Sequence, residues 1–173
     1  MTEIQDQAQA PQSEALLNKT LVGVMEAILP RYFRAVRRVV EQAEGTERLT
    51  LAQFRCLQAI AAQGTTLATH LAWVLGVTMP TMTSRIDGLV ERGLVEREPD
   101  PQSRRQVLLR LTPAGRAVLE FYTALVDAWL HNLLAVLSAA QKRRLLAVLQ
   151  DIEMLLDGSA RARPEEGAAV LEE

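Results

Sequence analysis

Two adjacent arginines, Arg104 and Arg105, stand in the stretch DPQSRRQVLLRLTP, which runs from Asp100 to Pro113. A guanidinium group forms paired hydrogen bonds with phosphate oxygens or with the edge of guanine, so the pair offers recognition of an anion. The preceding DPQS is rich in turn formers, which would expose both side chains. Paired arginines on an exposed turn are more often solvated than functional. Their meaning therefore depends on the elements that position them.

The charge of the chain is segregated. Residues 78–116 contain seven basic and five acidic side chains, a charge of +2, in a chain whose formal charge is −2. Affinity for DNA depends on the local neutralisation of phosphates and the release of counterions, so an acidic chain is not excluded from binding it. The overall balance argues against indiscriminate binding.

A helix is predicted over residues 13–44 because apolar side chains recur there at helical spacing. These side chains are Leu17, Leu21, Val24 and Ile28. Pro30 removes a helical hydrogen bond and crowds the preceding turn, which predicts a kink or break near Leu29. Further along, Thr50 and Gln53 have the spacing of a capping box for a second helix, which Gly64 ends.

Two short helices follow. Thr66 is placed to cap the first, and Gly76 provides the tight turn after it. Thr78 is placed to cap the second, with Pro80 in the first turn, where the missing N–H has no intrahelical partner. Two short helices around a glycine predict a helix-turn-helix, in which the second helix enters a major groove.

The next segment changes character. Residues 94–98 and 106–112 are β-compatible runs on either side of PDPQSRR, which predicts a hairpin. A helix-turn-helix followed by a hairpin is a winged helix, and the arginine pair then lies at the tip of its wing. Thr112 and Pro113 predict the start of another helix, and Ser138 with Gln141 predict a capping box before the last one.

The block from Leu67 to Gly115 resembles the MarR family of bacterial transcriptional regulators. The resemblance is carried by LATHLAWVLGVTMPTMTSRIDGLVERGLVEREPDPQSRRQVLLRLTPAG, with its GLVER turn, its Asp-Pro-x-x-Arg-Arg wing and its LTPAG helix start. With the flanking helices it covers residues 14–157. One departure is Ser103, where the family usually has an acidic residue that orients an arginine of the pair.

These observations predict a mainly α fold with a winged helix-turn-helix domain, a two-stranded wing, and N- and C-terminal helices forming a dimerisation domain. The expected boundaries are disordered tails at residues 1–13 and 158–173, helical dimerisation segments at 14–45 and 114–157, and a DNA-binding domain at 46–113. The resemblance implies a homodimer that binds double-stranded DNA at a palindromic operator as a repressor. It also implies release by a small effector, for which an aromatic compound is expected.

Helical geometry assigns roles within this domain. With Met82, Ile86, Leu89 and Val90 toward the core, the predicted base or backbone contacts of the second helix are Thr81, Ser84 and Arg85, with Pro80 on the same face. Thr83 is expected to lean toward the core. Thr78 suits a phosphate at the helix start, where N-terminal amides also help. In the wing, Arg104 and Arg105 suit a minor groove or its phosphates, and the predicted contact set is completed by Asp100, which would hold one arginine, and Ser103.

Aromatic side chains suggest where an effector would bind, although such residues at helical spacing more often belong to the core. The candidate ligand residues are Tyr32, Phe54, His70 and Trp73. A single cysteine, Cys56, leaves open a thiol-switched regulator, and a depressed thiol pKa with exposure would be required for it. A winged helix that binds protein instead of DNA is a second alternative.

Other function classes are disfavoured. The chain has no nucleophile with a positioned base, no phosphate-binding glycine loop, and only two histidines, which lie far apart, so neither an enzyme nor a metal or other cofactor is expected. The polar start does not read as a secretory signal, and charges interrupt every long apolar run. A soluble, cytoplasmic protein is predicted.

Overall fold

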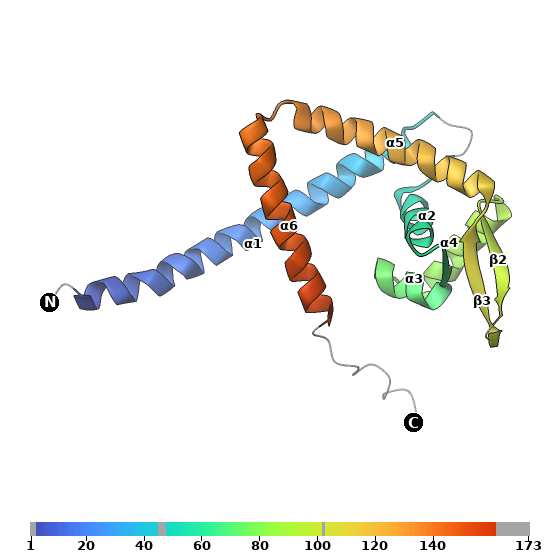
Figure 1. The fold of residues 1–173 in the computed structure, drawn as a ribbon, viewed down its shortest axis with the longest axis horizontal. Helices are drawn as coiled ribbons and strands as arrows, with labels where there is room; N and C mark the ends of the chain where they lie inside the picture. Colours follow the sequence, from blue (N-terminus) through green and yellow to red (C-terminus); the bar gives the residue numbers. More distant parts are fainter. Residues whose placement is uncertain (1–2, 45–47, 102, 162–173) are drawn as a thin grey trace, which may run out of the picture. The chain divides into compact units, whose positions relative to one another are not determined.

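A computed structural model describes residues 3–44, 48–101 and 103–161 (Figure 1). The chain forms two compact units, residues 1–128 and 129–173, with the boundary inside helix α5. The described residues form six helices and one three-stranded antiparallel sheet. In order these are α1 (Glu3–Glu41), α2 (Leu51–Gln63), β1 (Thr65–Leu67), α3 (Ala68–Leu75), α4 (Met79–Glu91), β2 (Val95–Asp100), β3 (Ser103–Leu111), α5 (Pro113–Ala135) and α6 (Ala139–Arg161).

Helix α1 is longer and more continuous than expected. It begins at Glu3, so the tail predicted to be disordered is helical from that residue on, and it passes through Pro30 without a break. The residues around the proline are good helix formers, and one lost hydrogen bond does not end a helix that propagates from both sides. At the other end α6 reaches Arg161, and the rest of the predicted C-terminal tail lies outside the described residues.

The local signals for helix ends are confirmed in most cases. The Gln53 amide donates to Thr50 Oγ1 at 3.2 Å and the Thr50 amide donates to Gln53 Oε1 at 3.0 Å, which is the predicted capping box. The same exchange joins Ser138 and Gln141. Gly76 has the left-handed backbone, φ 62°, that the turn between α3 and α4 requires.

The helix-turn-helix and its wing are present, with one strand more than predicted. The sheet has the order β1-β3-β2, and both pairings are antiparallel. Thr66 was expected to cap α3 but lies in β1, buried opposite Leu109, and Leu67 begins the helix without a side-chain cap. The hairpin also extends further than expected, to a pairing of Asp100 with Ser103.

The core of the first unit sets the orientation of α4. Its largest fully buried side chains come from α2, α3, α4, the turn before β2, β3 and α5: Phe54, Leu57, Ile60, Leu71, Met82, Ile86, Leu89, Leu94, Leu109 and Tyr122. The Leu49 amide donates to the Tyr122 hydroxyl at 3.1 Å, which ties the chain before α2 to α5. Because three side chains of α4 enter this core, its opposite face is turned outward. No helix in the described ranges has the length and apolar character needed to cross a membrane.

Candidate nucleic-acid interface

The outward face of α4 carries a shallow hollow that both polar and apolar residues line. The hollow is lined by Met79, Pro80, Thr83, Ser84, Asp87, Gly88 and Glu91. Met82, Ile86 and Leu89 on the other side of the helix are at most 1% exposed. In the middle of this face Thr83, Ser84 and Gly88 are short, which allows the helix backbone to approach a groove closely.

Two predicted contact residues, Pro80 and Ser84, lie on this face, and one that the sequence reading set aside also does. Thr83 is exposed and lines the hollow, so the expectation that it leans toward the core is wrong. The predicted core-facing stripe of α4 included Val90, which is only partly buried. Counting Val90 as core placed Thr83, which lies on the same side of the helix, on the core face as well. The spacing i, i+4 from Thr83 to Asp87 is the signal that places them together.

The first turn of α4 carries a pair of hydroxyl groups. Thr78 is the N-cap residue, but its side chain makes no capping hydrogen bond, which differs from the prediction. Its Oγ1 lies 3.0 Å from Oγ1 of Thr81, and both residues are exposed. The first amides of a helix lack intrahelical partners and carry positive partial charge, so this turn is suited to an anion.

The wing brings its predicted residues together at one end of the hairpin. Asp100 ends β2 opposite Ser103, and Arg104 and Arg105 follow in β3. The side chains of residues 103–105 lie outside the described part of the chain. The interaction predicted between Asp100 and one arginine therefore stays a prediction.

Two other arginines of this region have carboxylate partners. Arg97 of β2 pairs with Asp87 of α4 at 2.5 Å. On the hairpin, Arg110 pairs with Glu96 at 2.9 Å and with Glu98 at 2.5 Å. All five side chains are about 40% exposed or slightly more, so these pairs stand at the surface and cancel part of its positive charge.

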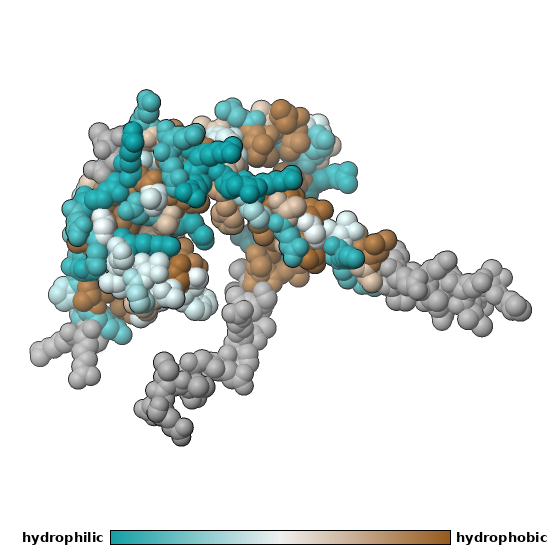
Figure 2. All heavy atoms as spheres, turned by 180° about the vertical axis from the view of Figure 1, so that it is seen from behind, coloured by the Kyte–Doolittle hydropathy of each residue, from teal (hydrophilic) through white to brown (hydrophobic). Residues whose placement is uncertain are grey.

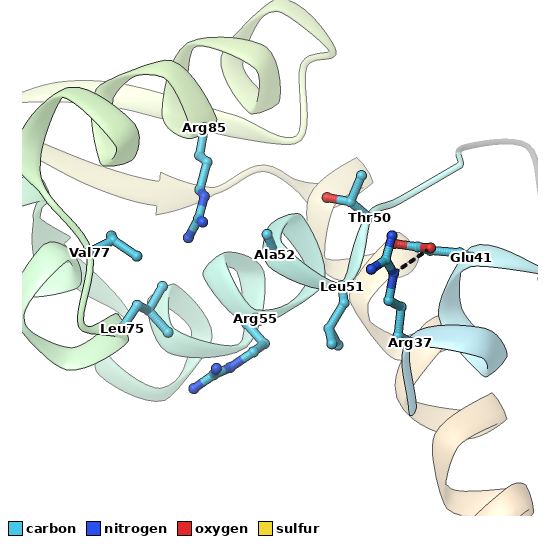
Figure 3. A pocket seen from close by; sticks show the side chains of 9 residues that line it. All are labelled: Arg37, Glu41, Thr50, Leu51, Ala52, Arg55, Leu75, Val77 and Arg85. Atoms are coloured by element: carbon cyan, nitrogen blue, oxygen red, sulfur yellow. Dashed lines mark hydrogen bonds and ion pairs between the residues drawn. The ribbon is translucent and has the colours of Figure 1, made fainter. Parts of the chain in front are cut away.

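A second site lies beside α4, on the side of α2. This pocket of about 510 Å³ is lined by Arg37, Glu41, Thr50, Leu51, Ala52, Arg55, Leu75, Val77 and Arg85 (Figure 3). Arg37 Nε bonds the Glu41 carboxylate at 2.8 Å. Arg55 and Arg85 extend into the same space from α2 and α4, and neither has a carboxylate partner among the described residues. The pocket thus combines apolar walls with two unneutralised cations.

Arg85 was predicted to contact bases or the adjacent backbone, and this stays a prediction. In the structure its guanidinium enters this pocket and not the hollow of the outward face. It reaches Cys56, which is fully buried in α2. Burial raises the pKa of the Cys56 thiol, while the Arg85 charge and hydrogen bond, and more weakly the Arg55 charge, lower it in part. The net pKa is raised, which disfavours the reactive thiolate.

We therefore expect Cys56 to be unreactive in the folded protein. Its reaction with an aromatic disulfide reagent at about pH 7.5 should be at least about 100-fold slower than in urea-unfolded protein, because both access and thiolate are lacking. Treatment with peroxide should leave nucleic-acid binding by the protein unchanged. Equal labelling rates for the folded and unfolded states would restore the thiol-switch alternative.

The four aromatic residues predicted to bind a ligand do not line this pocket. Tyr32 packs against Phe33, with ring centroids 5.5 Å apart, and His70 against Trp73 at 5.9 Å. Phe54 is buried against Tyr122. The sequence did not predict this pocket: Arg55 was not singled out, and Arg85 was assigned only to DNA. The two residues come from separate helices and follow no common spacing.

Comparison with known proteins identifies relatives. The model of the MarR family matches residues 49–107, from the end of the α1–α2 connection into β3. The chain is 38% identical over 84 residues to the multiple antibiotic resistance protein MarR of Escherichia coli K12, an alignment covering 49% of this chain and only 58% of that protein. It is 30% identical over 111 residues to the HTH-type transcriptional repressor NicR of Pseudomonas putida, covering 62% of this chain and 70% of NicR.

Solved structures of related regulators have a similar fold. A cysteine-to-serine mutant of E. coli MarR complexed with operator DNA has a TM-score of 0.56 and 30% identity, over 73% of this chain and 95% of that chain. A structure of Bordetella bronchiseptica BpsR, which describes regulation of DNA binding by 6-hydroxynicotinic acid, has a TM-score of 0.59 and 26% identity, over 75% and 98%.

Proposed function

Because this chain belongs to the MarR family, we propose that it is a transcriptional regulator that binds operator DNA through α4 and the β2–β3 wing. The observation that carries the proposal is the outward face of α4, with short side chains and a hydroxyl-bearing first turn, in the same unit as a hairpin that carries paired arginines. Members of the family are regulators and not enzymes, in agreement with the sequence analysis. A regulator that binds chromosomal DNA in a bacterium acts in the cytoplasm, so we propose a cytoplasmic location.

The proposed contacts follow from this geometry. Ser84, Thr81 and the added Thr83 meet base edges or the adjacent backbone in the major groove, because a hydroxyl pairs with either a donor or an acceptor. Thr78 and the first amides of α4 bind a phosphate. Arg104 and Arg105 occupy the neighbouring minor groove or bind its phosphates.

Binding of the purified protein to the DNA around its own gene tests this proposal. A gel-shift titration across a salt series, with unrelated DNA as competitor, should give saturable binding that resists the competitor. If neither this DNA nor a random-sequence selection yields a preferred site, a winged helix that serves a protein partner replaces the proposal.

A homodimer is proposed from the exposed apolar faces. Figure 2 shows apolar surface standing among hydrophilic residues. In α1, Leu17, Leu21 and Ile28 are more than half exposed, and in α6 so are Leu146 and Leu149. Monomeric proteins rarely leave such surface uncovered, and a two-fold dimer buries the same surface on each subunit. Its two winged domains would read a palindrome with half-sites about one DNA turn apart.

Replacing Leu21 with glutamate tests the dimer. A carboxylate buried in an apolar interface should cost about 2 kcal/mol or more, which corresponds to a roughly 30-fold rise in the dimer dissociation constant. Sedimentation equilibrium measures this constant. Lys19→Glu, on the opposite side of the same helix, is the matched control. Equal dissociation constants for the two variants would exclude α1 from the interface.

The proposed regulation is repression that a small aromatic acid relieves. Two relatives support this mode of regulation for the present chain: NicR is named a repressor, and 6-hydroxynicotinic acid regulates DNA binding by BpsR. The pocket beside α4 is the proposed site, because Ala52, Leu75 and Val77 would receive a ring and Arg55 a carboxylate. An effector acts only if its affinity differs between the DNA-binding and released states.

A further inference from the structure

We propose that the Arg85 guanidinium is shared between two anions that exclude each other: the carboxylate of an aromatic effector in the pocket and a phosphate of the operator. This inference rests on the proposed function and names the group through which the effector and the DNA compete. It makes Arg85 a regulatory residue of α4 whose side chain is not part of the outward face.

In the pocket, Arg85 has no carboxylate partner among the described residues. The residue is half-buried, and its guanidinium meets the Cys56 thiol, a weak acceptor, in place of a carboxylate. A neighbouring cation, Arg55, enters the same space and stacks over the Phe33 ring at 5.6 Å. Two cations without a carboxylate partner repel each other, so an anion bound between them is stabilised by both. Arg37 is already neutralised by Glu41.

On α4, Arg85 lies close to the proposed phosphate site at the first turn. It follows Thr81 by four residues and Thr78 by seven, so its Cβ starts from the flank of the helix that carries the hydroxyl pair. Side chains in helices point toward the helix N-terminus, and arginine has a long flexible stem. A rotation about its side-chain bonds carries the guanidinium from the pocket to the phosphate proposed at the first turn of α4. No ion pair within the described residues has to break for this movement.

Competition for one guanidinium produces regulation without a large rearrangement. An effector carboxylate that holds Arg85 removes one phosphate contact in each subunit, and DNA that holds Arg85 removes one of the two cations of the effector site. The coupling is reciprocal and cannot exceed what Arg85 contributes to DNA binding. Couplings of this kind typically change affinity by about 5- to 150-fold.

The test uses benzoate as the probe and the uncharged benzamide as its control. Fluorescence anisotropy with the DNA selected by the protein should show that saturating benzoate weakens binding by roughly tenfold, at the lower end of typical couplings, while benzamide has no effect. In Arg85→Met, DNA affinity without ligand should fall by a similar factor, and the slope of log K against log salt should decrease by about 0.9 per subunit. Benzoate should no longer weaken DNA binding by this variant.

Two further variants separate the halves of the proposal. Arg55→Met should weaken benzoate binding to the DNA-free protein, measured by calorimetry, without a change in the salt slope, because Arg55 serves only one of the two anions. Arg34→Met removes the same charge from an exposed position on α1 outside the pocket and should change neither measurement. Unchanged thermal unfolding of Arg85→Met shows that its fold is intact.

The inference is overturned if Arg85→Met keeps the parental DNA affinity and salt slope, or if benzoate still releases it. It is also overturned if the parent protein binds DNA but not benzoate, a result that leaves the proposed DNA-binding function standing. A parent protein that binds no DNA contradicts the proposed function itself.

Discussion

Replacing Gly115 with alanine is expected to lower the free energy of unfolding by about 3 kcal/mol, at the upper end of the usual cost of overpacking. A Cβ on Gly115 would lie 1.9 Å from the carbonyl oxygen of Leu94 and 2.9 Å from the carbonyl carbon. Both are backbone atoms, so no side-chain rotation relieves the overlap. Either the start of α5 or the turn before β2 must move.

Neither element moves easily, because three hydrogen bonds centred on Thr112 join them. The Thr112 amide donates to the Leu94 carbonyl at 3.1 Å, and Thr112 Oγ1 donates to the Gly93 carbonyl at 2.7 Å. The same hydroxyl accepts from the Gly115 amide at 2.9 Å. Shifting Gly115 would therefore strain three hydrogen bonds around the buried Leu94 side chain.

Urea denaturation followed by circular dichroism measures the loss as a lower midpoint. Gly23→Ala is the matched control, since a Cβ at this position of α1 meets nothing within 4 Å. There the better helix propensity of alanine should stabilise by up to about 1 kcal/mol. A Gly115→Ala midpoint equal to that of the parent would mean that α5 does not pack this closely on Leu94.

The features predicted correctly from the sequence are those encoded by a few adjacent residues. The capping boxes of Thr50 and Ser138 and the left-handed Gly76 each act within one turn of chain. The order of helices, turn and hairpin followed from these signals and from apolar periodicity. On α4, Ser84 is exposed as predicted, whereas Thr83 is exposed and was expected to lean toward the core, because the predicted core face included the partly buried Val90.

The features that were missed depend on residues far apart in the sequence. Thr66 reads as a helix cap until its pairing with Leu109 in β3 makes it part of a strand. The pocket draws its residues from α1, α2, α3, α4 and the connections beside α2 and α4, so neither Arg55 nor Arg85 marks it alone. Arg85 in particular was assigned only to bases or the adjacent DNA backbone, because helical geometry gives the direction of Cβ and not the course of a long side chain.

Removing both wing arginines, Arg104→Ala with Arg105→Ala, is expected to have the largest effect on DNA binding. Each arginine should cost on the order of 1 to 3 kcal/mol if it reaches bases, and should lower the salt slope by about 0.9 if it binds a phosphate. The pairing of Arg97 with Asp87, and of Arg110 with two glutamates, increases the dependence on the wing tip, because those cations are already neutralised.

Anisotropy titrations across a salt series separate the two modes of contact, and Arg38→Ala, which removes one charge from an exposed site on α1, controls for net charge. The minor groove distinguishes A·T from G·C pairs but little else. A double variant that loses only wing contacts should therefore keep its sequence preference at the positions that α4 reads and lose it at the flanking ones. Loss of preference at every position would instead mean that the wing is needed to seat α4, and unchanged affinity and slope would remove the wing from the interface.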